Sequence, residues 1–347
     1  MQFSFAKASN ARSAGRRALR TLVVFSTALA LSLAQQPQQP IRVQVNEVVV
    51  PVTVTTEQGK FVSDLDQKDF KIFDQGKEQT IRYFNRERNQ RVVVGFLVDL
   101  SNQSRGQWKS LQEATIELVL NLLPGDKKYA GYLIGYGNEA ELMVNTTSDP
   151  DPIVERLRKV SPSGGSAFYD ALYMACTSRK LVDGEPVDPR RVIVVIGDGH
   201  DNASSKTLDQ VIELAQRYQV TINAMSTDAY GFTSDSGKNL ERMAQETGGR
   251  VEYPLMNVYK DVSGFLSQPS DEGNYQLKVG TGGYTAAILG SIYKSIANIA
   301  GEITVQYVLR FVPSDVDESK VKRSLEVKVS LPNVIVKART YYYPFSP

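Results

Sequence analysis

The chain has 347 residues, of which 41% are hydrophobic and 22% are charged, as in a soluble globular protein with room for two domains. The first 40 residues contain five basic residues and no acidic one, so the rest of the chain has a net charge of −3. A mildly acidic body does not supply the basic face that a nucleic-acid-binding protein needs. Cys176 is the single cysteine, which excludes an internal disulfide, and its apolar neighbours predict a small buried side chain rather than a reactive thiol.

Residues 1–34 have the organisation of a secretory signal peptide. A basic segment precedes an apolar run from Leu22 to Ala34, and Ser32 and Ala34 supply the small side chains of a cleavage site. The run is shorter than the roughly 20 apolar residues of a spanning helix, although an uncleaved anchor is the alternative. We therefore expect an exported protein, periplasmic or secreted, with a polar linker over residues 35–41.

Residues 42–88 are predicted to form an N-terminal β segment. Valines recur there with a period close to two residues up to position 54, as in a strand. Shorter strands are expected over residues 70–73 and 81–84, with a glycine turn between them. This part of the chain contains no helical periodicity.

An α/β pattern begins at residue 89. The apolar runs 91–98 and 191–196 are expected for strands that are buried on both faces of a parallel sheet. Helices are predicted over residues 106–123, 152–160, 169–180, 204–218 and 238–246, with strands over 129–136, 141–144, 220–226 and 251–253. This alternation predicts a doubly wound, mostly parallel sheet of Rossmann-like type with helices on both faces.

A second β segment ends the chain. After a loop-rich stretch over 254–283, an amphipathic helix is predicted over 284–300, and three strands follow it within residues 301–347. The segments 42–88 and 301–347 are each about half of a sandwich-sized domain. We expect them to pair into one β-sandwich, with the α/β domain over 89–300 inserted between them.

Polar residues gather at what should be one edge of the predicted sheet. Asp99 and Ser101 follow the first buried strand, Asp198 follows the second, and Ser166 stands just before a helix. Ligands bind outside the carboxyl ends of the strands in open α/β sheets. Carboxylate and hydroxyl oxygens suit Mg²⁺, with Mn²⁺ or Ca²⁺ as alternatives, and a partly hydrated ion leaves a position for an acidic residue of a partner protein.

The order Asp-x-Ser, then Gly-Gly-Ser before a helix, then an apolar strand followed by Asp-Gly, resembles the metal-ion-dependent adhesion site of von Willebrand factor type A domains. The resemblance implies metal ligation by Asp99, Ser101, Ser166 and Asp198. It also implies a second serine at position 103, where this chain has Gln103, whose longer side chain offers a carbonyl oxygen. A metal-dependent protein–protein interaction or adhesion, without catalysis, is therefore the expected function.

The similarity to a von Willebrand factor type A domain covers about residues 89–255. The whole chain resembles a family of exported proteins with such a domain that was first described in acidobacteria. Its leader, the valine-rich segment 48–54 and the tail segment 306–313 carry this wider resemblance.

Other functions remain open from the sequence alone. His200, the single histidine, lies beside two aspartates, so a hydrolase of the Ser-His-Asp type is one alternative. A phosphatase-like enzyme with Asp99 as its nucleophile is another. A structural envelope protein with a degenerate metal site is the third, whereas no glycine-rich phosphate-binding loop follows either buried strand.

Overall fold

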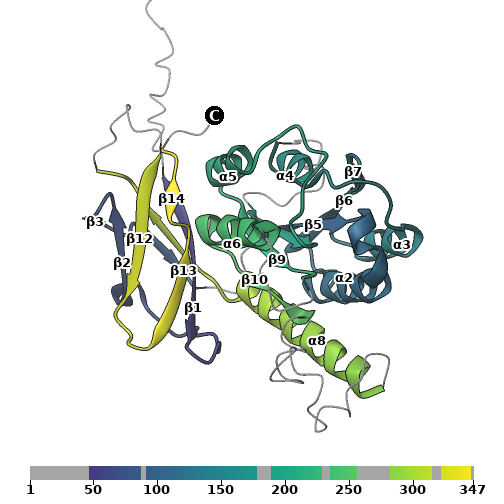
Figure 1. Cartoon of the computed structure of the whole chain (residues 1–347). Coiled ribbons are helices and arrows are strands. Elements are labelled where there is room, and N and C mark those ends of the chain that lie inside the picture. Colours follow the sequence, from purple (N-terminus) through teal and green to yellow (C-terminus); the bar gives the residue numbers. More distant parts are fainter. Residues whose placement is uncertain are drawn as a thin grey trace, which may run out of the picture. The chain divides into compact units, whose positions relative to one another are not determined.

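The computed structural model describes residues 47–86, 91–177, 189–228, 235–255, 282–314 and 322–344. The predicted leader and linker, and most of the 254–283 stretch, lie outside these residues. The described residues all fall within one unit, residues 46–347, which contains an α/β domain and an all-β domain (Figure 1).

The α/β domain is built on a six-stranded sheet with the order β10-β9-β8-β5-β6-β7. Its strands are β5 (Val92–Asp99), β6 (Tyr129–Tyr136), β7 (Ala140–Thr147), β8 (Arg190–Ile196), β9 (Thr221–Met225) and β10 (Val251–Glu252). All neighbours pair in parallel except β7, which is antiparallel to β6 at the edge of the sheet. The predicted doubly wound, mostly parallel fold is therefore confirmed.

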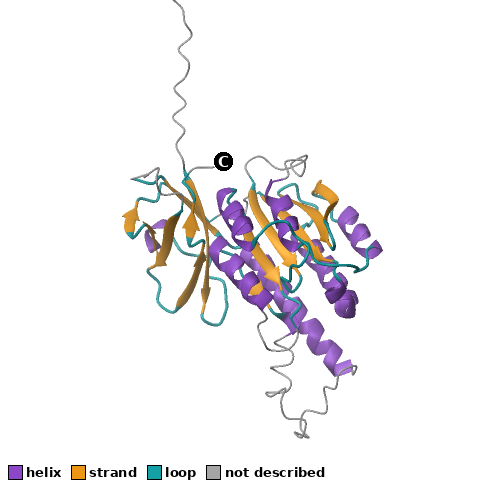
Figure 2. Ribbon diagram, turned by 45° about the horizontal axis from the view of Figure 1, so that its top comes forward, coloured by secondary structure: helices purple, strands orange, loops and turns teal. Residues whose placement is uncertain are grey.

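Helices cover both faces of this sheet (Figure 2). One apolar core joins one face to α2 (Trp108–Leu122), α3 (Asp151–Lys159) and α8 (Gly282–Thr304). A second core joins the other face to α4 (Phe168–Thr177), α5 (Leu208–Arg217) and α6 (Asp235–Thr247). Every residue of β5 is buried because each face of the strand contacts one of these cores, which explains its uninterrupted apolar sequence.

The strand order changes direction at β5. From β5 the chain runs to β6 and β7 on one side of the sheet and then returns to β8 on the other side. The carboxyl ends of β5 and β8 are therefore neighbours at the switch point, where open α/β sheets form their ligand sites.

Helix α5 begins at Leu208, four residues later than the sequence predicts. Thr207 caps it: the Thr207 hydroxyl accepts a hydrogen bond from the Gln210 amide, and the Gln210 side chain accepts one from the Thr207 amide. The chain between β8 and this cap is thus left free to form a loop at the switch point.

The all-β domain consists of two four-stranded sheets, with the orders β13-β1-β11-β4 and β14-β12-β2-β3. Strands from before the α/β domain are β1 (Val48–Thr56), β2 (Phe70–Asp74), β3 (Lys77–Gln79) and β4 (Tyr83–Asn85). Strands from after it are β11 (Tyr307–Phe311), β12 (Arg323–Val329), β13 (Val334–Ala338) and β14 (Tyr341–Tyr342). Both sheets contain strands from both ends, and one apolar core joins them, so the predicted pairing of the two β segments is confirmed.

Strand β1 has a proline in the interior of its sheet, which is unusual because proline cannot donate a backbone hydrogen bond. The first half of β1, Val48 to Val52, pairs with β11, and the second half, Val52 to Thr56, pairs with β13. Pro51 lies in the half that pairs with β11 alone, so its missing N–H is tolerated.

A buried ion pair joins the two ends of the chain. The Arg323 guanidinium on β12 donates to both carboxylate oxygens of Asp74 on β2, with Nε–Oδ1 at 3.0 Å and Nη2–Oδ2 at 2.7 Å. The side chains of Asp74 and Arg323 are 0% and 6% exposed. Such a bidentate pair fixes the register of the two strands as well as their distance.

Candidate functional site

Two carboxylates lie at the switch point. Asp99 is the last residue of β5, and Asp198 follows β8 by two residues, so adjacent parallel strands deliver both to one edge of the sheet. Asp99 is buried and Asp198 is half-buried. Each accepts a hydrogen bond from a nearby backbone amide: Asp99 Oδ1 from Ser101 at 2.7 Å, and Asp198 Oδ1 from His200 at 2.8 Å.

The electrostatics of this pair are unfavourable without a compensating positive charge. Burial raises the pKa of the Asp99 carboxyl, and the negative charge of Asp198 raises it further, although the hydrogen bond from the Ser101 amide opposes the shift. Burial also raises the pKa of the Asp198 carboxyl, with a further contribution from the charge of Asp228. Two partly dehydrated carboxylates at one edge form a favourable environment for a cation.

The loop after β5 places Ser104, rather than Gln103, inside the site. Ser101 precedes a 3₁₀ helix, η2 (Asn102–Gln107), in which the Ser104 amide donates to the Ser101 carbonyl at 3.2 Å. A 3₁₀ helix has three residues per turn, so the side chains of Ser101 and Ser104 lie on the same side. Both serines are buried, whereas the Gln103 side chain is exposed.

The two serine hydroxyls have unused capacity to bind a ligand. Among the described residues, the Ser101 and Ser104 Oγ atoms are buried side-chain oxygens without a hydrogen bond of normal geometry. Both lie close enough to Asp99 to lower the pKa of its carboxyl. A buried hydroxyl without a partner is costly, at about 1–3 kcal/mol, so these atoms point to a missing ligand.

The loop before α4 contains Ser166, which is 1% exposed. Two asparagine side chains fix this loop: Asn138 Oδ1 accepts from the Gly165 amide at 2.6 Å, and Asn202 Oδ1 accepts from the Ser166 amide at 2.8 Å. The Ser166 hydroxyl donates to the His200 carbonyl at 2.7 Å, which leaves lone pairs of its oxygen available to a cation.

The glycines before Ser166 are explained by these contacts. Gly164 has φ +84°, and a Cβ there would lie 2.6 Å from Asn138 Oδ1. A Cβ on Gly165 would lie 2.8 Å from Asn202 Oδ1. The Gly-Gly pair therefore lets two asparagines approach the backbone and position the serine hydroxyl.

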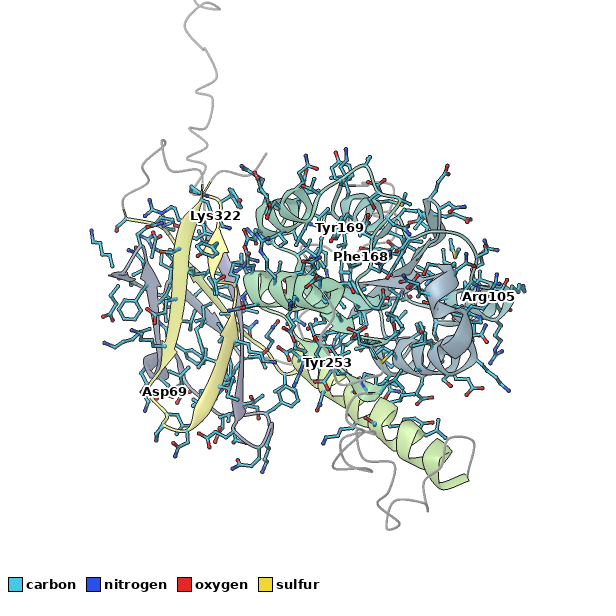
Figure 3. The ribbon with its side chains drawn as sticks, in the orientation of Figure 1. Asp69, Arg105, Phe168, Tyr169, Tyr253 and Lys322 are labelled. Atoms are coloured by element: carbon cyan, nitrogen blue, oxygen red, sulfur yellow. The ribbon has the colours of Figure 1, made fainter. Side chains whose placement is uncertain are left out.

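The loop after β8 also holds the beginning of α4. Asp201 accepts a hydrogen bond from the Tyr169 amide at 2.8 Å and another from the Ser204 hydroxyl at 2.5 Å. Tyr169 and its neighbour Phe168 are labelled in Figure 3, together with Arg105 of the η2 loop. Because Ser166 shortly precedes α4, this contact holds the loop after β8 against the loop that contains Ser166.

A phenol lies beneath the two carboxylates. Tyr136, the last residue of β6, is directly opposite Asp99 in the parallel pairing and is 1% exposed. Burial, and then the charges of Asp99, Asp198 and Asp201, raise the pKa of the Tyr136 phenol well above its ordinary value, so this phenol keeps its proton.

The structure thus brings Asp99, Ser101, Ser166 and Asp198 to one edge of the sheet, and it adds residues that sequence reasoning missed. Ser104 was detectable only by reading its loop with a period of three. Asn138 and Asn202 contribute by binding backbone amides, and Tyr136 contributes by lying next to Asp99 on the neighbouring strand. Neither kind of role leaves a sequence motif.

Two features are absent from the residues that the structure describes. No three side chains of the types His, Cys, Asp and Glu gather closely enough to hold a metal ion, so a cation site here depends on serine hydroxyls as well as carboxylates. None of the described helices has the length and apolar character needed to cross a membrane.

Comparison with known proteins gives a family match within the α/β domain. Residues 94–200 match the von Willebrand factor type A domain. No curated protein matches the chain.

Three solved structures illustrate the structural similarity. A von Willebrand factor type A protein from Catenulispora acidiphila is 12% identical, with a TM-score of 0.41, over 73% of this chain and 66% of that one. BatB from Bacteroides thetaiotaomicron is 16% identical, with a TM-score of 0.37, over 46% of this chain and 88% of that one. Proximal thread matrix protein 1 from the mussel byssus, with a zinc-occupied MIDAS motif, is 15% identical, with a TM-score of 0.38, over 49% and 43%. None of the three reaches a TM-score of 0.5, so the domain assignment rests on the sequence match.

Proposed function

We propose that this von Willebrand factor type A domain binds a protein partner through a divalent cation held at the carboxyl edge of its sheet. The observation that carries the proposal is the pair of buried hydroxyls of Ser101 and Ser104, which lie beside the Asp99 carboxylate without a hydrogen bond of normal geometry. Buried polar groups are normally hydrogen-bonded, and these two hydroxyls lie together beside a carboxylate at the switch point, where a cation could use them.

The proposed ligand set is Asp99, Ser101, Ser104, Ser166 and Asp198. Ser104 replaces Gln103 in this set, because the Ser104 oxygen is buried in the site and the Gln103 side chain is exposed to solvent. Hard oxygen donors of this kind suit Mg²⁺, and Mn²⁺ or Ca²⁺ could take its place.

When bound, the cation would supply Lewis acidity and a positive charge between the two carboxylates. The protein offers few charged ligands, and Mg²⁺ retains water in such sites. A carboxylate from an acidic residue of the partner would complete this ligand set, which would make the protein–protein contact depend on the cation. With the predicted leader, this function belongs to an exported protein, in the periplasm or outside the cell.

The hydrogen bonds of His200 and Ser166 near the carboxylates favour binding over catalytic turnover. The backbone of His200, and not its ring, donates to Asp198 and accepts from Ser166. The Ser166 hydroxyl thus donates to a carbonyl instead of to a general base. This hydrogen bond fixes the position of the hydroxyl but does not activate it as a nucleophile.

The first experiment measures thermal unfolding with and without Mg²⁺. Cation at 100 times its dissociation constant should stabilise the wild-type protein by about 2.7 kcal/mol. Ser104→Ala should lose most of this stabilisation, and the matched variant Gln103→Ala should keep it. Equal Mg²⁺ responses of the two variants would contradict the proposed ligand set, and no response of the wild type would contradict the cation site itself.

The second experiment tests the partner. The mature protein is used to capture proteins from an envelope extract, in Mg²⁺ and in chelator, with Asp99→Ala as the control. A partner that is retained only by the wild type in Mg²⁺ supports the proposal. Recovery of the same proteins under all conditions would remove the cation from the function.

A further inference from the structure

The Tyr136 phenol lies beside the proposed ligand set but is not part of it. Its hydroxyl is buried and is among the described side-chain oxygens without a hydrogen-bond partner. The ring is held in place from one side by Phe168, with ring centroids 5.3 Å apart.

Gly197 shows where the hydroxyl points. A Cβ on Gly197 would collide with the Tyr136 hydroxyl, and it would also lie 2.9 Å from Asp99 Cβ and 3.5 Å from Asp99 Oδ2. The phenol oxygen and Asp99 Oδ2 thus both lie close to the backbone of Gly197. The absence of a side chain at Gly197 is what allows the hydroxyl and the Asp99 side chain to approach the backbone this closely.

The hydroxyl is not explained by packing, because a phenylalanine would fill the same space without a buried, unsatisfied polar atom. A hard cation with few charged ligands keeps several waters, and each of them has protons to donate.

We propose that Tyr136 is a positioning residue for the cation site, whose phenol oxygen accepts a hydrogen bond from a water of the cation's hydration shell. The Tyr136 hydroxyl proton is then free to turn toward a carboxylate oxygen. This inference rests on the proposed function, because it assigns a role in binding the same cation. The phenol strengthens binding by orienting one water from the protein side, opposite the side that is left to the partner.

The test compares Tyr136→Phe, which removes only the hydroxyl oxygen, with Tyr132→Phe. Tyr132 lies four residues earlier on β6 and is also buried, but its hydroxyl lies beside Gly95 and away from the loops. Mg²⁺ affinity is measured by calorimetry and unfolding temperature without cation by circular dichroism. We expect Tyr136→Phe to weaken Mg²⁺ binding about 2- to 12-fold, the value of one hydrogen bond, and to unfold at the same or a higher temperature without cation. A purely structural role would lower both quantities.

A second measurement observes the tyrosines directly in the wild-type protein. Loading the wild-type protein with Mg²⁺ should produce a tyrosine difference spectrum in the near ultraviolet, which Tyr132→Phe retains and Tyr136→Phe loses. If the wild type binds Mg²⁺ without such a spectrum, or if Tyr136→Phe binds Mg²⁺ as tightly as the wild type, the inference is wrong while the proposed function survives. If the wild type does not bind Mg²⁺, both are wrong.

Discussion

Removal of the Asp74 carboxylate tests how strongly the two ends of the chain are joined. In Asp74→Ala, the Arg323 guanidinium would stay in a position where 6% of its side chain is exposed, without either of its bonds to the carboxylate. Breaking a buried ion pair in this way costs about 3–5 kcal/mol, because the remaining charge is dehydrated and unpaired.

The control is a neighbouring ion pair that is exposed to solvent instead of buried. Lys71 and Glu78, on β2 and β3, are 3.4 Å apart with side chains 59% and 55% exposed. Lys71→Ala should therefore reduce the free energy of unfolding by no more than about 1 kcal/mol. The two variants differ in burial while they share the same sheet.

The measurement is urea unfolding at neutral pH, followed by far-ultraviolet circular dichroism and by the fluorescence of Trp108 on α2, the single tryptophan. A loss in Asp74→Ala no larger than that in Lys71→Ala would refute the reasoning. Asp74→Leu combined with Arg323→Met should recover most of the lost stability, because an apolar pair leaves no dehydrated charge. A double variant as unstable as Asp74→Ala would show that the charge is not the cause.

Two further variants test the close approach at the site and the buried thiol. Gly197→Ala should destabilise the protein by about 1–3 kcal/mol, because its Cβ would collide with the Tyr136 hydroxyl, whereas Gly106→Ala, with nothing within 4 Å, should not; equal melting temperatures would contradict this. Burial raises the pKa of the Cys176 thiol from 9.0 to about 12, so the thiol ionises at lower pH in the unfolded chain than in the folded protein. The contribution of the neutral thiol to the free energy of unfolding is therefore complete below pH 9 and is lost as the pH rises toward 12. Relative to Cys176→Ala, the wild type should lose about 1.4 kcal/mol per pH unit in that window when urea unfolding is measured; parallel losses in both proteins would argue against a buried neutral thiol.

The fold was largely predictable because its strongest signals are long and apolar. The β5 and β8 runs are uninterrupted, since both of their faces are buried, and such runs have few other interpretations. The pairing of the two β segments followed from their half-domain size. The beginning of α5 was not predictable from apolar spacing, because it depends on the cap at Thr207 and on loop residues that bond across to α4.

The site was predictable only in part, for a different reason. Asp99 and Asp198 follow apolar strands, so topology alone brings them together. The choice between Gln103 and Ser104 depends on whether the loop turns with a period of two or three, and a short polar loop carries no signal that distinguishes these. Tyr136 looked like an ordinary strand residue, because its importance comes from the strand beside it and from the space left by Gly197.

The arrangement of β1 also affects how the chain is made. Its valine-rich strand leaves the ribosome early, yet both of its sheet neighbours lie beyond residue 306. At about 5–20 residues per second, the strand waits roughly 10 to 50 seconds for those partners, while the inserted domain is already able to fold. During that interval β1 has two unpaired edges, which is the situation that leads to wrong pairing between chains. Pro51, which interrupts the hydrogen-bonding pattern near the middle of the strand, is well placed to limit such pairing before the last strands are synthesised.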